Sequence, residues 1–459
     1  MKLWNHIKKH MLKTPFQTIE EGTCSMTYED AIIFAESFAK HIKKEKCCAI
    51  ICGSELMQAI ALLSCFAANI TAVPLSVRYG EIYCNRILDT ISPTAVITDM
   101  DGQLQVLHIR DSNYIPPQIC PSLIMCTSGT TGAPKGVMLT EENVLITLFN
   151  IGDYFKIDSA DSILISRPLY HSAVLTGEFL ISLVKGLKIR FVSEKFNPKA
   201  LLDLIDEHNI TVLGGTPTML SLMVRFMNKN KESSLRKICI SGECMSKQIA
   251  KQIEDVFCNA EIYHVYGLTE AGPRVSYLPP RLFKTNAHTV GIPVSSVCFM
   301  VVKPDGKIAD INEEGILWIK GENVMSGYYN EPELTAKVMK KGWLCTGDIA
   351  LIDSQGLLNI KGRADDLIIR AGMNIYPQEI ENALKSDSRV KEVLAYKIEN
   401  SNISTQIGLK ISGDFANSDE VKLLCIEVLP SFQMPSVIEL VEELPKNSSG
   451  KIIREVKKC

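Results

Sequence analysis

The chain lacks an excess of charge of either sign. Its 459 residues include 49 lysines and arginines and 52 aspartates and glutamates, which gives a net charge of −3 at pH 7. Proteins that bind nucleic acids or anionic membrane surfaces usually carry a clear basic surplus. The charge balance therefore argues against nucleic acid and anionic lipid as partners.

Paired cysteines and a leader sequence are also missing. None of the 15 cysteines forms a Cys-x-x-Cys pair, so the common zinc and redox motifs are unsupported. The N-terminal segment Met1–His10 has neither the apolar core nor the cleavage site of a signal peptide. Many thiols without a secretion signal indicate a reducing compartment, and we predict a cytoplasmic protein.

No hydrophobic run is uniform enough to span a membrane. The most apolar stretch, Leu56–Leu75, contains Gln58, Asn69 and Pro74, and its pattern changes midway. We predict a buried helix over residues 55–68 and a strand over 71–75, and we expect no stable insertion into a membrane.

Strand-like and helical patterns alternate as far as about residue 290, which predicts an α/β fold with largely parallel sheets. Thr27–Lys43 is the clearest helix, because Thr27 can cap it and Asp30 follows three residues later. Strands are predicted at Cys47–Cys52, Thr94–Asp99, Ser122–Cys126, Ser162–Ser166, Leu187–Val192, Thr211–Gly214, Lys237–Ser241 and Glu261–Tyr266.

The whole chain is too long for a single hydrophobic core, so more than one domain is expected. The sequence pattern changes in its last third. Short strands and Gly- or Pro-marked turns predict a β-rich, antiparallel subdomain over about 290–360. We therefore predict a large N-terminal domain, 1–362, of two α/β subdomains plus this β-rich subdomain. A small mobile α+β domain follows over 363–459, with a hinge near 363–366.

The loop Cys126–Gly136 combines three glycines, four hydroxyl residues and one lysine. Glycine lets backbone N–H groups approach a ligand closely, and hydroxyls and a lysine add donors and charge, so the loop is typical of a phosphate site. The P-loop motif is not matched, because Gly136 follows Lys135 where that motif needs Ser or Thr. We predict a strand before the loop and the start of a helix over Val137–Phe149.

Four further polar clusters have both a functional and an ordinary interpretation. Tyr266–Glu270 ends a predicted strand, where α/β proteins bind ligands, but could be a simple turn. Asp348 after Thr-Gly suits ribose hydroxyls, but also an Asx turn. The charged segment 362–366 is either a solvated linker or a hinge with a nucleotide contact. Lys451, on a loop hinged by glycine, is either a catalytic arm or part of a frayed tail.

Taken together and in this order, these clusters resemble the adenylate-forming carboxylate ligases: acyl- and aryl-CoA synthetases, carrier-loading adenylation domains and luciferases. Gly327-Tyr328-Tyr329 and Trp343 match as well, and the resemblance spans essentially the whole chain. It implies that a small carboxylic acid reacts with ATP and Mg²⁺ to give acyl-AMP and pyrophosphate. The acyl group then passes to a thiol, either CoA or the phosphopantetheine of a carrier protein acting in trans.

The resemblance also implies a role for each matching residue. Lys451 would bridge the carboxylate and the α-phosphate, Thr269 would bind the α-phosphate, and Glu270 would bind Mg²⁺. Asp365 would be the hinge that brings up the loop around Gly372. The β- and γ-phosphates would be held by Thr127, Ser128, Gly129, Thr130, Thr131, Gly132 and Lys135. The adenosine would be bound by Tyr266 stacking on adenine, by the adjoining Gly267, and by Asp348 and Arg363 at the ribose.

The acid pocket is less clearly marked. His171 stands where amino-acid-activating relatives often carry an Asp, and a histidine cannot supply a fixed negative charge. An acyl or aryl acid is therefore favoured, although His171 could simply pack beneath the nucleotide. Candidate pocket stretches are Tyr170–Val174, Gly214–Pro217, Ser241–Cys244 and the residues just before Tyr266.

Three alternatives remain open. A stand-alone amino-acid adenylation enzyme would load a carrier protein in trans, since only eight residues follow Lys451. A non-catalytic nucleotide-binding relative is disfavoured by the presence of Lys451, Glu270 and Asp348. A phosphotransferase is disfavoured by the missing Gly-Lys-Ser/Thr.

Overall fold

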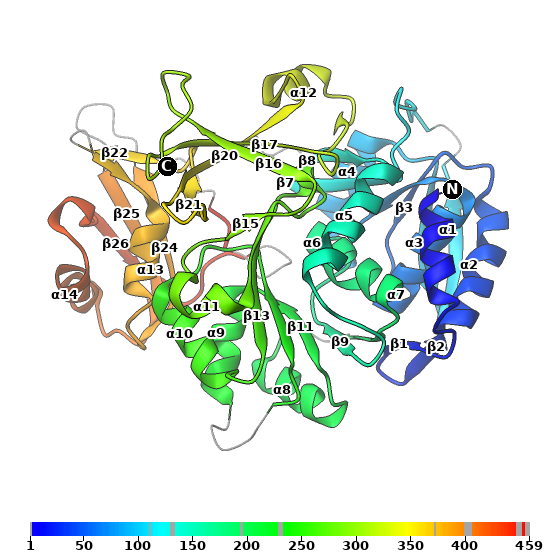
Figure 1. Ribbon diagram of the computed structural model, residues 1–459, viewed down its shortest axis with the longest axis horizontal. Helices are drawn as coiled ribbons and strands as arrows, with labels where there is room; N and C mark the ends of the chain where they lie inside the picture. Colours follow the sequence, from blue (N-terminus) through cyan, green and yellow to red (C-terminus); the bar gives the residue numbers. More distant parts are fainter. Residues whose placement is uncertain are drawn as a thin grey trace.

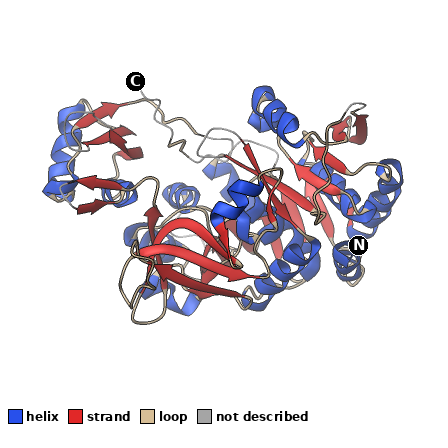
Figure 2. Ribbon diagram, turned by 90° about the horizontal axis from the view of Figure 1, so that it is seen from above, coloured by secondary structure: helices blue, strands red, loops and turns tan. Residues whose placement is uncertain are grey.

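Two large sheets, a β-rich layer and a separate C-terminal unit make up the fold (Figure 1). The computed structural model describes residues 2–109, 112–128, 134–192, 196–227, 233–370, 373–398, 406–446 and 452–454. In Figure 2 the C-terminal unit stands beside the rest of the molecule. The predicted α/β class is confirmed, with a large N-terminal part and a smaller α+β C-terminal part.

Among the described residues, seven strands form the first sheet, in the order β18-β8-β7-β4-β3-β5-β6. Its four central strands run parallel, and the strands at both edges are antiparallel. The strands are β3 (Cys47–Ile50), β4 (Thr71–Pro74), β5 (Ala95–Met100), β6 (Gln103–His108), β7 (Leu123–Ser128), β8 (Pro134–Leu139) and β18 (Gly327–Tyr328). Helices α2 (Tyr28–Ile42), α3 (Glu55–Ala68) and α4 (Glu81–Ile91) belong to this part of the chain.

Helix α3 explains the most apolar stretch of the sequence. It spans the predicted residues, and every side chain from Leu56 to Ala67 is buried inside the protein. A helix that is apolar all round is a core helix when neighbouring elements cover it. In the part of the chain that the structure describes, no helix combines the length and hydropathy that a membrane crossing requires.

Nine strands of the described chain form the second sheet, in the order β15-β14-β13-β12-β11-β9-β10-β1-β2. The strands β13, β12, β11, β9, β10 and β1 are parallel neighbours, so their carboxyl ends share one edge. The strands are β1 (Thr18–Glu21), β2 (Cys24–Thr27), β9 (Ser162–Ile165), β10 (Lys188–Phe191), β11 (Val212–Gly215), β12 (Lys237–Ile240), β13 (Glu261–Tyr266), β14 (Ser276–Leu278) and β15 (Ile292–Pro293).

Helices cover this second sheet, as the α/β pattern predicts. One continuous helical run crosses it as α6 (Ser172–Val174), the π-helical η2 (Leu175–Leu180) and α7 (Ile181–Lys185). The other helices are α1 (Lys2–Met11), α5 (Glu141–Tyr154), α8 (Pro198–Glu207), α9 (Pro217–Phe226), α10 (Lys247–Val256) and α11 (Pro280–Asn286).

Local sequence signals set the ends of most of these elements. Thr27 caps α2 as predicted: its hydroxyl accepts from the backbone N–H of Asp30 at 3.1 Å and donates to the Asp30 carboxylate at 2.6 Å. The helix predicted over Val137–Phe149 is wrong in its first residues. Val137 lies in β8, which pairs antiparallel with β7, and α5 begins at Glu141 behind a capping box on Thr140. The glycine-rich loop therefore closes a β-hairpin.

The β-rich segment is antiparallel, as predicted. It contains β16 (Val297–Val302), β17 (Gly315–Gly321), β19 (Met339–Lys340), β20 (Trp343–Ile352) and β21 (Leu358–Arg363). The short helix α12 (Pro332–Val338) precedes β19.

The C-terminal unit has its own small core. It contains β22 (Ile368–Arg370), β23 (Met373–Ile375), α13 (Pro377–Leu384), β24 (Val390–Ile398), β25 (Gln406–Gly413), α14 (Ser418–Val428) and β26 (Val437–Leu440). The boundary at 362–363 and the mobility of this unit stay predictions.

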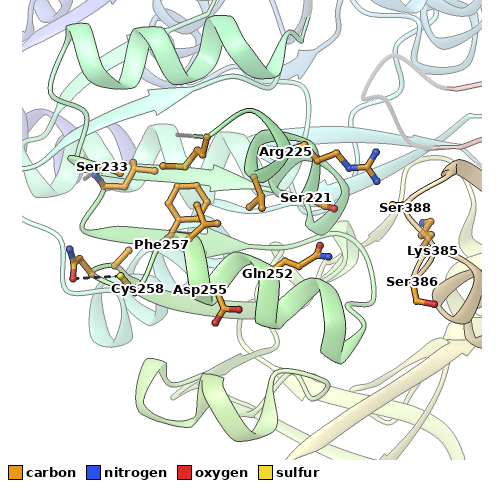
Figure 3. Close-up of a pocket in the computed structure, with 16 residues that line it drawn as sticks. Ser221, Arg225, Ser233, Gln252, Asp255, Phe257, Cys258, Lys385, Ser386 and Ser388 are labelled. Atoms are coloured by element: carbon orange, nitrogen blue, oxygen red, sulfur yellow. Dashed lines mark hydrogen bonds between the residues drawn. The ribbon is translucent and has the colours of Figure 1, made fainter. Parts of the chain in front are cut away.

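A cavity of about 750 Å³ lies between the C-terminal unit and helices α9 and α10 (Figure 3). A polar contact crosses the same interface from Gln248 Nε2 to the Ser386 carbonyl at 3.1 Å, and the Tyr376 hydroxyl donates to Glu314 of the β-rich segment at 2.6 Å. None of the lining residues belongs to the predicted site. The cavity is thus a feature of the interface between the two parts.

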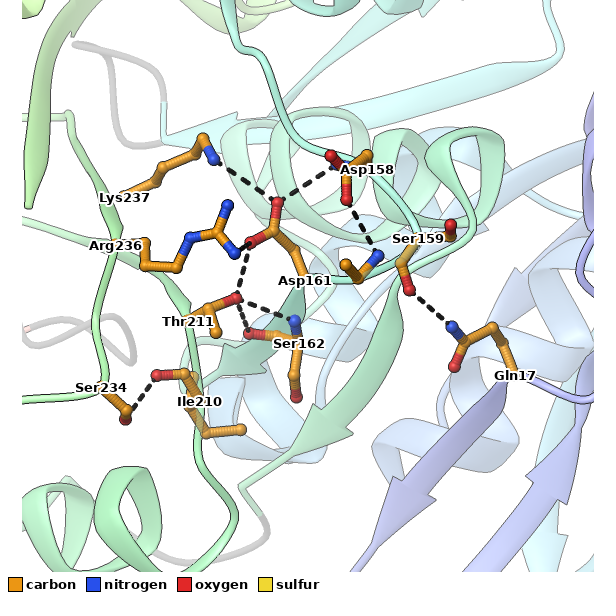
Figure 4. A network of polar contacts seen from close by, with 11 residues as sticks. Gln17, Asp158, Ser159, Asp161, Ser162, Ile210, Thr211, Ser234, Arg236 and Lys237 are labelled. Atoms are coloured by element: carbon orange, nitrogen blue, oxygen red, sulfur yellow. Dashed lines mark hydrogen bonds and ion pairs between the residues drawn. The ribbon is translucent and has the colours of Figure 1, made fainter.

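A buried carboxylate ties together the amino ends of β9, β11 and β12 (Figure 4). Asp161 is 1% exposed. It accepts a hydrogen bond from the Thr211 hydroxyl at 2.8 Å, and the Lys237 ammonium lies 3.5 Å from its other oxygen. The backbone N–H of Asp158 donates to the same carboxylate at 3.2 Å. This network fixes the edge of the sheet opposite to the carboxyl ends of the strands.

Replacing Asp161 should therefore destabilise the fold. In Asp161→Ala the buried Lys237 ammonium loses its carboxylate, and we expect the free energy of unfolding in urea to fall by about 3–5 kcal/mol. Asp158→Ala, which removes an exposed carboxylate three residues before the buried one, should cost less than about 1 kcal/mol. Equal losses for the two variants would contradict the role given to Asp161.

Candidate active site

Three predicted residues from distant parts of the chain meet at one carboxylate. Tyr266 ends β13, Asp348 lies in β20, and Arg363 ends β21. The Tyr266 hydroxyl donates a hydrogen bond to one oxygen of Asp348, and Arg363 Nη1 donates to the other oxygen at 3.0 Å. The structure thus brings together the residues predicted to bind adenine and ribose.

The Thr-Gly-Asp sequence presents Asp348 to these partners. Asp348 and Arg363 are directly opposite in the antiparallel pairing of β20 with β21. The Thr346 hydroxyl accepts from the Asp348 N–H at 3.0 Å and donates to the Leu317 carbonyl at 2.9 Å. Gly347 has a φ of 73°, and a Cβ there would crowd the Arg363 guanidinium. This position therefore favours glycine for both reasons.

The charges in this trio are well defined. Burial raises the pKa of the Tyr266 hydroxyl well above its ordinary value, and the adjacent Asp348 raises it further, so Tyr266 is a neutral donor. Partial burial opposes the charge of Arg363, but the attraction of Asp348 leaves its pKa above the usual range. Each oxygen of Asp348 keeps a further lone pair with which it can accept from ligand hydroxyls.

Tyr328 links Glu270 to Lys135 of the glycine-rich loop. The Tyr328 hydroxyl donates to Glu270 at 2.8 Å, and the Lys135 ammonium lies 5.8 Å from the centroid of the same ring. Lys135 is in β8, Glu270 is in the short η3 turn (Thr269–Ala271), and Tyr328 is in β18, which pairs with β8. Tyr328 thus contacts a carboxylate through its hydroxyl and a cation through its ring.

Thr269 lies against the segment that carries His171. The hydroxyls of Thr269 and Ser172 are 3.1 Å apart, and His171 precedes Ser172 at the start of α6. The ring of His171 is half-buried, with its centroid 4.0 Å from that of Tyr170. The predicted α-phosphate residue and the predicted acid-pocket residue are therefore neighbours.

The segment before His171 is held by a carboxylate from α3. Glu55 accepts a hydrogen bond from the Leu169 backbone N–H at 3.1 Å. Burial raises the pKa of Glu55 to about 7, although the bond from Leu169 opposes this shift. The sequence did not mark Glu55 as part of the site, because its partner is distant in the chain.

Gly267 has a steric role. The chain returns antiparallel to β13, with the Val275 N–H donating to the Tyr266 carbonyl at 2.9 Å. A Cβ at Gly267 would overlap the carbonyl of Pro273. Any other residue here would push apart the segment that carries Thr269 and Glu270.

Several predicted residues lie outside the described part of the chain. These are Gly129, Thr130, Thr131, Gly132, Gly372, Lys451 and the side chain of Ser128. Their flanks are described. Thr127 pairs with Lys135 at the base of the loop. The exposed Asp365 lies two residues beyond Arg363, the last residue of β21.

The two ends of the Lys451 loop are held together. The Ile453 N–H donates to the Pro445 carbonyl at 2.8 Å, and Lys446 and Ile452 form a β-bridge. Arg454 makes an ion pair of 2.6 Å with the buried Glu381 of α13. The described residues on both flanks of Lys451 are thus held together, and Arg454 ties them to the core of the C-terminal unit.

The family model of AMP-binding enzymes matches residues 4–329. A long-chain-fatty-acid–CoA ligase of Haemophilus influenzae is 31% identical over 367 residues, which covers 77% of this chain. The chain belongs to the AMP-binding enzyme family. The predicted membership of the adenylate-forming ligases is thereby confirmed.

Some other relatives align with this AMP-binding enzyme over more of their own length. The alignment spans only 65% of the Haemophilus ligase, but a 2-succinylbenzoate–CoA ligase of Geobacillus kaustophilus is 28% identical over 98% of this chain and 96% of its own. An o-succinylbenzoate CoA synthetase of Bacillus subtilis, solved with its acyl-adenylate intermediate, is 24% identical with a TM-score of 0.86, covering 99% of this chain and 98% of its own.

The same Bacillus enzyme has been solved with ATP and a magnesium ion. That structure is 25% identical to this chain, covers 98% of each chain and gives a TM-score of 0.85. The similarity of the structures confirms the fold.

The carboxylate trio can be tested by nucleotide binding. Asp348→Asn keeps the shape but loses the charge that Arg363 faces, and we expect AMP affinity to fall about 10–100-fold in calorimetry. Asp310→Asn, an exposed carboxylate in the same β-rich segment, serves as the control. Unchanged affinity in Asp348→Asn would remove this residue from the nucleotide site.

Proposed function

We propose that this enzyme activates a carboxylic acid with ATP and transfers the acyl group to CoA. A carboxylate oxygen attacks the α-phosphorus, the bond to pyrophosphate breaks, and acyl-AMP forms. The observation that carries the proposal is the convergence of Tyr266, Asp348 and Arg363 at the carboxyl edge where Thr269 and Glu270 also lie. Such chemistry depends mainly on positioning and on stabilising charge.

The phosphates would be held from two sides. The loop from Thr127 through Gly132 and the cation of Lys135 bind the leaving pyrophosphate, and Thr269 binds the α-phosphate. Glu270 is a fitting ligand for Mg²⁺, which proteins often hold through one or two carboxylates together with substrate phosphates. Consistent with this, the described residues contain no cluster of three or more metal-ligating side chains. When bound, the ion neutralises phosphate charge.

In the second half-reaction the CoA thiol attacks the acyl carbonyl, the bond to AMP breaks, and a thioester forms. We favour CoA because several relatives of this chain are named CoA ligases. The C-terminal unit would turn about Asp365 between the two steps. Since the described cysteines are all free thiols, a reducing compartment such as the cytoplasm is consistent with this role.

The activity is tested by ATP–pyrophosphate exchange against a panel of carboxylic acids, followed by thioester formation with CoA and with a holo-carrier protein. AMP and pyrophosphate are the expected products, and ADP would contradict the proposal. If the acyl group passes to the carrier protein and not to CoA, the carrier protein is the acceptor. Exchange with an α-amino acid would contradict the interpretation of His171.

Lys451 should serve only the first step. Lys451→Ala should lower the rate of pyrophosphate exchange at least about 10²–10³-fold, because a charge that stabilises the transition state is lost. Thioester formation from added acyl-AMP should continue. Lys391→Ala, an exposed lysine of the same unit, should leave both steps intact. Undiminished exchange in Lys451→Ala would exclude the proposed role.

Asp365 should be needed for the rotation of the C-terminal unit between the two half-reactions. Its backbone N–H makes no hydrogen bond to another described residue, so proline can enter without breaking one. Asp365→Pro stiffens the backbone at this position. We expect pyrophosphate exchange to persist and thioester formation to fall at least about tenfold, whereas Asp365→Ala retains both. Equal loss of both steps would contradict a hinge at this position.

A further inference from the structure

Three charged side chains are buried beside the site but have no part in the mechanism above. Glu178 is 3% exposed and Arg274 is 2% exposed, and the side chain of Arg167 is 13% exposed. Burying charge is costly unless it is paired. Such a cluster therefore needs a structural or functional reason.

The cluster lies at the carboxyl edge of the second sheet. Arg167 follows β9, and Gly214 and Cys239 lie near the carboxyl ends of β11 and β12. Glu178 comes from the π-helical segment η2, which contacts β9. Arg274 comes from the chain that returns beside Tyr266. Gly214 was predicted to line the acid pocket, so the cluster borders the predicted position of that pocket.

Each side chain in the cluster makes defined contacts. Arg167 forms an ion pair with Glu178 through Nη2. Arg274 donates from Nε to the Tyr154 hydroxyl at 3.1 Å and from Nη1 to the Pro273 carbonyl at 3.2 Å. The thiol of Cys239 senses all three charges: burial raises its pKa most, Arg274 and Arg167 lower it, and Glu178 raises it. The charges of Arg167, Glu178 and Arg274 therefore all act on the same buried thiol.

Two glycines make room for these charges. A Cβ at Gly214 would overlap the carboxylate of Glu178, and a Cβ at Gly177 would overlap the guanidinium of Arg274. A core stabilised only by packing would fill this space with apolar side chains. The arrangement is instead built around the charged groups.

The hydrogen bonding of the cluster is incomplete. Glu178 Oε2 and Arg167 Nε are buried and have no hydrogen-bond partner among the described residues. Buried polar atoms without a partner are rare and usually indicate a bound molecule or water. A ligand carboxylate can accept from Arg167 Nε, whereas Glu178 Oε2 needs a donor such as water. One carboxylate also faces two guanidiniums, which leaves a surplus of one positive charge in the interior.

The cluster lies within reach of a short acid. Ser172 contacts Thr269, next to the proposed reaction centre, and Glu178 is six residues further along the same helical run. At about 1.5 Å of rise per residue, the two positions are roughly 9 Å apart along the helix. That distance matches an acid with a backbone of several carbon atoms.

We propose that Arg167 and Arg274 bind a second carboxylate at the far end of the substrate, so that the enzyme activates a dicarboxylic acid. This inference rests on the proposed function. A plain alkyl end would leave the buried positive charge without a counter-ion. An ammonium end could pair with Glu178, but two guanidiniums would repel it.

The wild-type enzyme tests this directly in the pyrophosphate exchange assay. Acids of one chain length are compared that differ only at the far end: methyl, hydroxyl, amino or carboxylate. We expect kcat/KM for the dicarboxylic acid to exceed that for the methyl-ended acid about 10²-fold or more, as for other sites that bind a buried polar group. An equal or higher value for the methyl- or amino-ended acid would overturn the inference while leaving the proposed function intact. If none of the tested acids supports pyrophosphate exchange, both this inference and the proposed function are contradicted.

Variants then assign the preference to the cluster, measured as the ratio of kcat/KM for the dicarboxylic and methyl-ended acids. Arg274→Gln should lower this ratio about 10²-fold, whereas Glu178→Gln, which removes the opposing charge, should raise it. Because both acids are assayed on one preparation, partial misfolding does not change the ratio. Arg281→Gln, an exposed arginine on α11, is the matched control. An unchanged ratio in Arg274→Gln would contradict the assignment.

Discussion

The carboxylate of Asp348 is the contact on which the arrangement of the site depends. It lies in the β-rich sheet, yet its two oxygens are held by Tyr266 from the nine-stranded sheet and by Arg363 from the last strand before the predicted hinge. One acidic group thus joins two sheets and the start of the C-terminal unit. Because these bonds involve a charged acceptor, they are stronger and more directional than neutral ones.

A shared edge of parallel strands supplies the rest of the site. Strands β9, β11, β12 and β13 end side by side. Gly214 lies near the carboxyl end of β11, and the segments that follow β9, β12 and β13 carry Arg167, Ser241 and Gly267. Glycines allow close approach at this edge, at Gly267 against the returning chain and at Gly214 against Glu178. The same edge therefore accommodates both residues predicted to bind the nucleotide and the buried charges, while Asp161 holds the opposite edge.

Much of this could be predicted from the sequence, since the signals are local. The cap at Thr27 and the apolar run of α3 each depend on residues within one element, and both predictions are confirmed. The residues of the glycine-rich loop, Glu270 and Asp348 could be singled out because their order along the chain is typical of one family. The error at Val137 arose because an antiparallel partner, β7, decides between strand and helix there.

The sequence by itself determined the fold class and the family, and it singled out the residues predicted to bind the nucleotide. Only the tertiary structure showed that Tyr266 and Arg363 share one carboxylate, that Tyr328 joins Lys135 to Glu270, and that Arg274 lies near Glu178. The physical reason is the separation along the chain between the residues that interact. Caps, turns and periodicity act between residues close in the chain, whereas charge pairing and burial depend on which distant segments the sheets bring together.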